Sequence, residues 1–472
     1  MASSIRTEFL PMLKIAVPVV LAELGWMTMG VVDTVMVGPL GPEAISAAGV
    51  GNSMHIAFAI FGMAVMLGLD TLVSQAFGAR DIRECHRLFF DGLMLAALLA
   101  VPIMAALVLV WFSIPLLGFH GAVRPLLEGY YGILLLSTPF LLAYAVCRRY
   151  LQGMHTAIPV MFALITANLI NVAANWTLIY GHLGFSALGV KGAAWATVIS
   201  RVYMLVALLF AVWWIDRRRS RDAGIDGHGL WQVDRAFDAA RVKRLLWLGL
   251  PAASQMGAEV GVFALATALS GMLDPISSAA HQISLNLAGV AFMIPLGLGS
   301  AGAVRVGHAV GARDRHRAAA AGWTAILLAT CFMVVAASTF VALPRQLIGL
   351  FSTDASVLSV GTSLLLLAAI FQLFDGIQGV ITGTLRGLGD TQTAMKVNLI
   401  AHWLFGLPVS YLLCFVAGWG VYGLWVGLSL GLIVVGSILF WVWSVKIRNY
   451  RDYGKLPMAL HSAEDTPAHH DL

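Results

Sequence analysis

Charge is what this sequence has least of. Only 11% of its 472 residues are Asp, Glu, Lys or Arg, whereas 59% are apolar and the mean hydropathy is +0.85. A soluble domain usually carries about 25% charged residues. A chain this apolar could not cover a surface that faces water. The composition therefore argues against a soluble enzyme, a disordered protein and a nucleic-acid-binding protein.

The sequence also lacks the motifs of disulfide, metal and nucleotide chemistry. Cys85, Cys147, Cys331 and Cys414 are far apart and form no C-x-x-C pair, which argues against a disulfide framework and a structural zinc site. Neither a P-loop nor an H-E-x-x-H motif occurs. We therefore expect no resident metal or cofactor, and ATP is not the expected energy source.

Long apolar runs fill most of the chain. A helix needs about 20 mostly apolar residues to span a membrane. Runs of that kind occur at 12–37, 49–72, 90–112, 126–147, 159–180, 188–214, 245–270, 281–303, 319–342, 358–382, 394–416 and 420–445. The sequence therefore predicts an all-α membrane protein with twelve transmembrane helices.

The basic residues predict how these helices are oriented. All but four of the 29 Lys and Arg lie at the two termini or in every second loop. The exceptions are Arg124, Lys191 and Arg345 in the other loops, and Arg201 inside the sixth span. Basic loops usually stay in the cytoplasm, so we expect a multi-pass protein with both termini there.

The chain also contains an internal repeat. A shift of 233 residues places Pro18 on Pro251 and the run Gly78-Ala79-Arg80-Asp81 on Gly311-Ala312-Arg313-Asp314. Both copies begin on the same side, so the repeats are parallel, as in carriers whose halves rock about a central site. We divide the chain into an N-terminal six-helix half (1–214), a cytoplasmic linker (215–244), a C-terminal six-helix half (245–445) and a cytoplasmic tail (446–472).

Acidic residues inside the spans mark the candidate site. Asp33 lies in the first span, Glu259 in the seventh and Asp375 in the tenth. An acid near the membrane centre costs about 2.5–3.5 kcal/mol on insertion scales, so such residues persist where they take up a proton, bind a cation or find a partner. We predict that these three bind the coupling cation and the charge of the substrate. Glu23 is a weaker candidate.

Amide and aromatic side chains extend this pattern. Asn and Gln residues recur at helical spacings near the acids, and a Phe lies one turn before Asp375. The predicted cavity-lining residues are Asn171, Asn175, Gln255, Gln282, Asn286 and Phe371. Hydrogen bonding between helices explains many such amides equally well, so both interpretations stay open.

Several motifs together resemble a known family. They are the run Val31-Val32-Asp33-Thr34-Val35-Met36-Val37-Gly38, the repeated Gly-Ala-Arg-Asp, and Phe371-Gln372-Leu373-Phe374-Asp375 followed by Gly383-Thr384-Leu385-Arg386-Gly387. The chain resembles the multidrug and toxic compound extrusion (MATE) family over about residues 10 to 445. Glu259 and the pair Asn171 and Asn175 are similar to its bacterial NorM-like branch.

The resemblance implies a secondary active carrier of the inner (plasma) membrane rather than an enzyme. It would export amphipathic cationic drugs or dyes in antiport with H⁺ or Na⁺, in contact with membrane lipids, and we expect a monomer. Asp33, Glu259 and Asp375 would be the coupling acids. Gln282 resembles a position that contacts drug, and Asp354 an acidic position of an outer loop. Some Na⁺-coupled members have Tyr where this chain has Phe371, which leaves both ions open and slightly favours H⁺.

Two other functions would require different residues inside the spans. A flippase or exporter of a lipid-linked or anionic substrate, within the same superfamily, would need basic residues in the cavity, and Arg201 is the one candidate inside a span. An intramembrane enzyme would need a catalytic constellation, which the sequence does not show, and the internal repeat argues against it.

Overall fold

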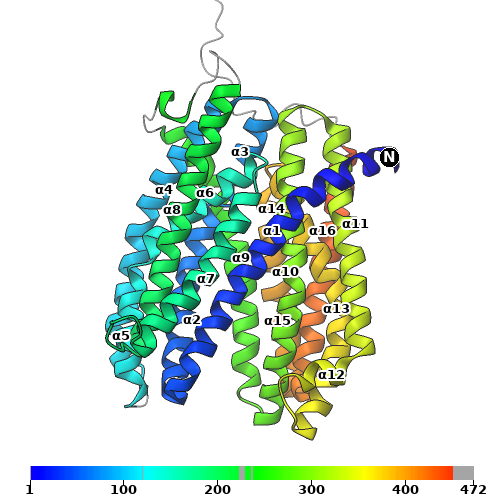
Figure 1. Ribbon diagram of the computed structural model, residues 1–472. Coiled ribbons are helices and arrows are strands. Elements are labelled where there is room, and N and C mark those ends of the chain that lie inside the picture. Colours follow the sequence, from blue (N-terminus) through cyan, green and yellow to red (C-terminus); the bar gives the residue numbers. More distant parts are fainter. Residues whose placement is uncertain (1, 120, 223–228, 235–237, 450–472) are drawn as a thin grey trace, which may run out of the picture.

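The computed structural model describes residues 2–119, 121–222, 229–234 and 238–449, and these residues form helices without strands (Figure 1). Eleven helices are long and apolar enough to cross a membrane. A further pair, α5 (Val123–Leu135) and α6 (Thr138–Gly153), is bent by 45° and counts as a twelfth span. The predicted all-α membrane fold is therefore confirmed. The predicted tail lies outside the described residues from 450 onward.

The spans follow the chain in two sets of six. The first set is α1 (Ala2–Val37), α2 (Pro42–Val65) continued by α3 (Gly68–Gly78), α4 (Ile82–Ser113), α5 with α6, α7 (Ile158–Tyr180) and α8 (Val190–Asp222). The second set is α9 (Ala239–Ser270), α10 (Pro275–Gly311), α11 (Arg315–Ala342), α13 (Ala355–Gly387), α14 (Thr391–Leu399) continued by α15 (Leu407–Tyr411), and α16 (Gly420–Arg448).

Short elements complete the chain. The π-helical turns η5 (Ile400–Gly406) and η6 (Leu412–Val416) flank α15, and α12 (Pro344–Gly349) precedes α13. Short 3₁₀ turns occur at η1 (Gly38–Leu40), η2 (Ile114–Leu116) and η4 (Leu230–Gln232). The end of the bundle that carries the connection between α8 and α9, at the top of Figure 1, is called the linker side below.

The repeated Gly-Ala-Arg-Asp sequence forms the same turn in both halves. Arg80 and Arg313 have positive φ angles of 64° and 56°, respectively. Each is followed by an aspartate that caps a helix: Asp81 accepts the Glu84 N–H at 2.9 Å, and Asp314 accepts the Arg317 N–H at 3.0 Å. A side-chain oxygen at this position satisfies an N–H that the first helical turn leaves free. The repeat thus encodes where α4 and α11 begin on the linker side.

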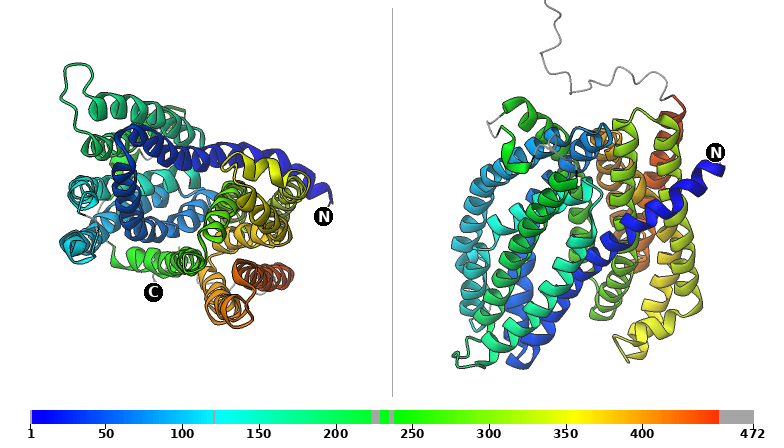
Figure 2. Two further views of the ribbon diagram at one scale, coloured as in Figure 1. Left: turned by 90° about the horizontal axis from the view of Figure 1, so that it is seen from below. Right: turned by 45° about the horizontal axis from the view of Figure 1, so that its top comes forward.

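Helix α1 connects the two sets of spans. It runs obliquely across the bundle, from one group of helices to the other (Figures 1 and 2). Ile15 and Val19 belong to an apolar cluster with α10, α11, α13 and α16, whereas Ala22 and Met29 belong to the cluster of the first set. The division at 1–214 and 245–445 stays a prediction from the repeat, and the start of α1 packs on the second half.

The glycines of the repeat close the linker side. A Cβ at Gly78 would collide with the carbonyl oxygen of His308, and a Cβ at Gly311 would collide with the carbonyl oxygen of Gln75. Gln75 and His308 are themselves equivalent under the 233-residue shift. The two halves therefore meet through one contact made twice, and only glycine fits at its centre.

We expect Gly311→Ala to lower the melting temperature of the purified protein in detergent. The added methyl has no space, and overpacking of this kind costs about 1–3 kcal/mol. Gly257→Ala is the matched control, because nothing lies within 4 Å of its Cβ position and Ala is the better helix former by about 0.5–1 kcal/mol. Equal melting temperatures for the two variants would contradict the close contact.

Candidate functional site

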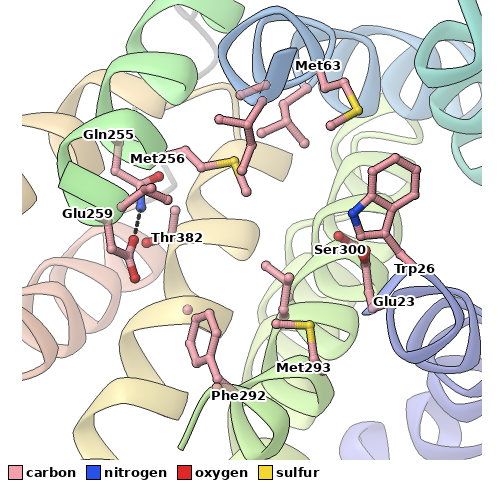
Figure 3. A pocket seen from close by; sticks show the side chains of 18 of the residues that line it. Glu23, Trp26, Met63, Gln255, Met256, Glu259, Phe292, Met293, Ser300 and Thr382 are labelled. Carbon is pink, nitrogen blue, oxygen red and sulfur yellow. Dashed lines mark hydrogen bonds between the residues drawn. The ribbon is translucent and has the colours of Figure 1, made fainter. Parts of the chain in front are cut away.

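A cavity of about 620 Å³ lies between the two halves. Its lining includes positions that are equivalent under the 233-residue shift, one from each half. These pairs are Glu23 and Met256, Trp26 and Glu259, Ile60 and Met293, Met63 and Leu296, and Leu67 and Ser300. Figure 3 shows Glu23 and Trp26 across the cavity from Met256 and Glu259. The cavity therefore has matching positions on its two walls but different chemistry on each.

The wall of the second half holds two carboxylates joined by an amide. Gln378 Nε2 donates to Glu259 Oε1 at 3.0 Å and to Asp375 Oδ1 at 3.3 Å. Gln255 Nε2 donates to the other oxygen of Glu259 at 2.9 Å (Figure 3). Phe371, one turn before Asp375, also lines the cavity. The structure thus brings together four of the candidate residues, from the two helices α9 and α13.

This carboxylate pair has no basic counter-ion among the described residues. The described hydrogen bonds of both acids come from glutamine amides, and neither acid forms an ion pair. The oxygen of Gln378 is buried and has no hydrogen-bond partner in the described part of the chain. Carboxylate and amide oxygens are ligands for hard cations, and carboxylates can also take up protons. The pair can therefore accept H⁺, Na⁺ or an ammonium group.

The opposite wall carries an acid that is already paired. Glu23 forms an ion pair with Arg148 of α6, and both side chains line the cavity. Beside them Trp26 stacks on Tyr144 with ring centroids 6.5 Å apart. Glu23 thus has a basic partner, whereas the described partners of Glu259 and Asp375 are neutral amides. A substrate cation would have to compete with Arg148 for it.

A shared aspartate joins the two halves at the linker-side end of the cavity. Asp70 Oδ2 lies 3.3 Å from Arg149 of the first half and 3.4 Å from Arg386 of the second. Next to it, the Thr71 hydroxyl donates to the Arg386 carbonyl oxygen at 2.6 Å, and Gln75 donates to the Gly387 carbonyl oxygen at 3.0 Å. These contacts tie α3 to α13 and separate the cavity from the linker side.

The position of these arginines corrects an expectation from the sequence. Arg148, Arg149 and Arg386 line the cavity, whereas the loop pattern assigns them to the linker-side surface and leaves Arg201 as the one basic candidate. The reason is that α6 and α13 continue past their apolar runs, so residues near their linker-side ends face inward. Their charge is nevertheless outweighed: with Glu23, Asp70, Glu259 and Asp375 there are four carboxylates against three guanidinium groups.

Asp33 lies away from this cavity. It accepts hydrogen bonds from Asn175 Nδ2 at 2.7 Å and from the Thr197 hydroxyl at 3.1 Å, and Asn175 also donates to Asn171 at 3.1 Å. Together with Tyr130 of α5, Asp33 lines a separate space of about 30 Å³ inside the first half. The structure thus separates Asp33 from Glu259 and Asp375 instead of forming one site with them.

Four of the predicted lining residues lie outside the central cavity. Asn171 and Asn175 are fully buried within the first half and do not line the central cavity, because their side of α7 faces α1. Gln282 and Asn286 also lie outside the lining: both are exposed on α10, on either side of the lining residue Leu285. Asp354 is exposed and caps α13, accepting the Ser356 and Val357 N–H groups at 2.8 and 3.0 Å. 

Several residues at these sites were not predicted from the sequence. Gln378 carries a usable signal, because it follows Asp375 by three residues and therefore lies on the same helical face. Thr197 of α8 has no such signal, since only the fold brings it to Asp33. The sequence does not identify the three arginines as cavity residues, because a charged residue ends an apolar run whether it faces solvent or a cavity.

The sequence matches a family model called MatE over residues 18–177 and 251–412, one segment in each half. The chain belongs to the MatE family. This confirms the resemblance to multidrug and toxic compound extrusion transporters. It also makes the chain a transporter rather than an enzyme, and a multi-pass membrane protein.

Relatives with established names cover nearly all of the chain. The "Probable multidrug resistance protein NorM" of Mesorhizobium japonicum is 35% identical over 450 residues, which is 93% of this chain and 94% of that protein. The "Multidrug resistance protein PmpM" of Pseudomonas aeruginosa is 36% identical over 440 residues, or 91% of this chain and 89% of that protein.

Solved MATE structures share the fold. The eukaryotic MATE transporter AtDTX14 superposes with a TM-score of 0.81 at 22% identity, covering 95% of this chain and 99% of that one. A MATE transporter in a bent conformation superposes with a TM-score of 0.83 at 18% identity, covering 94% of this chain and 96% of that one. At these identities the match supports the fold alone.

We expect Asp70→Asn to open the linker side of this MatE protein. Two arginines from different halves would lose their shared carboxylate, and breaking a buried ion pair costs about 3–5 kcal/mol. A cysteine in place of Ser300, in a Cys331→Ser background, reports access to the cavity. An impermeant maleimide added from the linker side should label it several-fold faster in the Asp70→Asn variant.

Asp274→Asn is the control for this labelling experiment, because Asp274 caps α10 on the protein surface and asparagine caps a helix equally well. Equal labelling rates in the Asp70 and Asp274 variants would show that the shared carboxylate does not hold the linker side shut.

Proposed function

We propose that the chain is a secondary active multidrug efflux transporter that exports amphipathic cations in antiport with H⁺ or Na⁺. The observation that carries the proposal is the pair Glu259 and Asp375, which faces the central cavity and has only glutamine amides as described partners. The named NorM and PmpM relatives support multidrug efflux. The coupling acids and the class of substrate are inferred from the cavity.

The shape and lining of the cavity suit an amphipathic cation. Ligand pockets for small molecules usually measure about 300–1,000 Å³, and this one measures about 620 Å³. Aromatic and thioether side chains line it, including Trp26, Phe263, Phe292 and Met256. A flat cation gains both apolar burial and attraction to aromatic faces in such a site, while Glu259 and Asp375 supply the opposite charge.

Exchange follows from competition at one carboxylate pair. When the acids are ionised and free, they hold the cationic group of the drug. When H⁺ or Na⁺ occupies them, that attraction is lost and the drug is released. Rocking of the two halves exposes the cavity first to one side and then to the other, so drug leaves as the coupling ion enters. Asp33 provides a second place for the ion, inside the first half.

The membrane setting follows from the charge pattern. We propose an inner-membrane protein with both termini and the linker in the cytoplasm, because basic residues gather on that side. On the linker side Arg217 stacks on Trp213 at 4.4 Å, and Arg218 on Trp214 at 3.7 Å. Such arginine and tryptophan pairs suit contact with lipid headgroups. We propose that the working unit is a monomer.

An exporter of anionic or lipid-linked substrates is the second candidate. Arg148, Arg149 and Arg386 on the cavity wall favour it. Each of them is within ion-pair distance of Glu23 or Asp70, so two carboxylates offset two of the three positive charges. Glu259 and Asp375 add two further negative charges without a described counter-ion, and the cavity as a whole therefore favours a cation.

We expect Asp375→Asn and Glu259→Gln each to reduce ion-driven efflux of a cationic dye from proteoliposomes at least tenfold, because each neutral amide removes the charge for which dye and ion compete. An imposed H⁺ gradient and an imposed Na⁺ gradient are applied separately, and the one that drives wild-type efflux identifies the ion. Glu128→Gln, on the surface of α5, serves as the control. Wild-type efflux by both cavity variants at equal protein levels would refute the assignment.

A further inference from the structure

Arg201 is a charged residue that the proposed exchange does not use. It lies on α8 inside a span and is 3% exposed. Its Nη1 donates to the Ser137 hydroxyl at 2.6 Å and lies 3.5 Å from His55 Nδ1. His55 in turn contacts the Thr138 hydroxyl at 3.0 Å. None of these groups is acidic, and among the described residues Arg201 forms no ion pair.

An isolated guanidinium inside a membrane protein is costly and needs a compensating charge. Asp33 is the acid that meets this need. Thr197, which donates to Asp33, lies four residues before Arg201 on α8, and four helical residues rise about 6 Å. Two opposite charges this near to each other attract through a buried, low-dielectric interior. No hydrogen bond or ion pair joins Asp33 to Arg201 among the described residues, so the attraction acts at a distance.

The other groups around Asp33 are neutral. Asn52 of α2 and Tyr130 of α5 line the same small space. Asn171 and Asn175 approach from α7, and Thr197 from α8. His55 of α2 lies 3.5 Å from Arg201. In the described part of the chain, Arg201 is thus the charged group near Asp33, and Tyr130 and His55 are the other titratable groups.

The repeat indicates that the two charges belong together. The position 233 residues after Asp33 is Ala266, and the sixth span of the second half, aligned through Gly189 and Gly420, has Leu432 in place of Arg201. Ala266 and Leu432 are both buried. The first half therefore carries both the acid and the base, and the second half carries neither at the matching positions.

We propose that Arg201 is a positioning residue that acts as the resident counter-ion of Asp33 and sets how readily that acid takes up the coupling ion. When the site is empty, Arg201 stabilises the ionised carboxylate. When H⁺ or Na⁺ enters, the positive charge of Arg201 opposes it, so the ion can leave again. This inference rests on the proposed role of Asp33 in coupling.

The bend between α5 and α6 gives this charge a second contact. Ser137, which accepts the Arg201 hydrogen bond, lies at that bend, and its own hydroxyl donates to the Leu134 carbonyl oxygen at 2.6 Å. A change in ion occupancy at Asp33 would alter the electrostatic pull on Arg201. The broken span is therefore the element best placed to respond.

The test compares Arg201→Gln with the charge-preserving Arg201→Lys in proteoliposomes. Dye release is measured against pH, or against Na⁺ if Na⁺ drives transport. Loss of the positive charge strengthens ion uptake at Asp33, so in Arg201→Gln the pH midpoint of release should move about one unit towards alkaline. For Na⁺, the half-maximal concentration should fall about tenfold. Arg201→Lys should stay near the wild-type midpoint.

A structural role for Arg201 would give a different result. Both variants would then lower the amount of active protein and leave the midpoint unchanged, which would overturn the proposal. If Arg201→Gln does not fold, the amount of folded protein is measured instead for the double variant Arg201→Gln with Asp33→Asn. Removing both charges should restore folding relative to Arg201→Gln alone, and no restoration would contradict the pairing.

Asp33→Asn alone separates this inference from the proposed function. If that variant keeps wild-type ion dependence, the coupling role of Asp33 is wrong and the proposal about Arg201 falls with it. If Asp33→Asn changes the ion dependence while Arg201→Gln leaves the midpoint in place, only the counter-ion proposal is refuted.

Discussion

The contact between the two repeats on the linker side is the constraint on which the rest of the structure depends. Gly78 packs on the backbone of His308 and Gly311 on the backbone of Gln75, so each half makes the same contact with the other. Because backbones meet there without side chains between them, α3 and α10 lie close together. That closeness brings Asp70 within reach of Arg386 and shuts the floor of the cavity.

A nearly symmetric scaffold carries asymmetric chemistry. Equivalent positions line the two walls, yet Trp26 stands where the other half has Glu259. The unpaired carboxylates are thus confined to the second half, while the acid of the first half, Asp33, is withdrawn into its own bundle. One half presents charge to the cavity, and the other presents an aromatic surface and an ion pair.

The helices could be predicted because hydropathy reports burial in lipid directly. Twelve apolar runs correspond to eleven long helices and one bent pair among the described residues, and the four-residue spacing of Gln255 and Glu259 is the spacing at which their side chains meet on α9. The sequence could not assign Asp33 to its own site, because the periodicity of α1 says which face is polar and not which neighbour it meets. Arg149 and Arg386 were misplaced since hydropathy cannot distinguish a surface from a wet cavity wall.

The reciprocal glycine contact has a consequence for how the two halves could diverge. Each copy of the repeated turn packs on the other copy, so a change in one alters the surroundings of its counterpart 233 residues away. Cavity walls that face each other across open space are free of that mutual restraint. Gly-Ala-Arg-Asp therefore persists in both halves of this chain, whereas Trp26 and Glu259 have become different residues. After a duplication, substitutions would be constrained at positions where the two copies are in contact and tolerated at positions that face each other across the cavity.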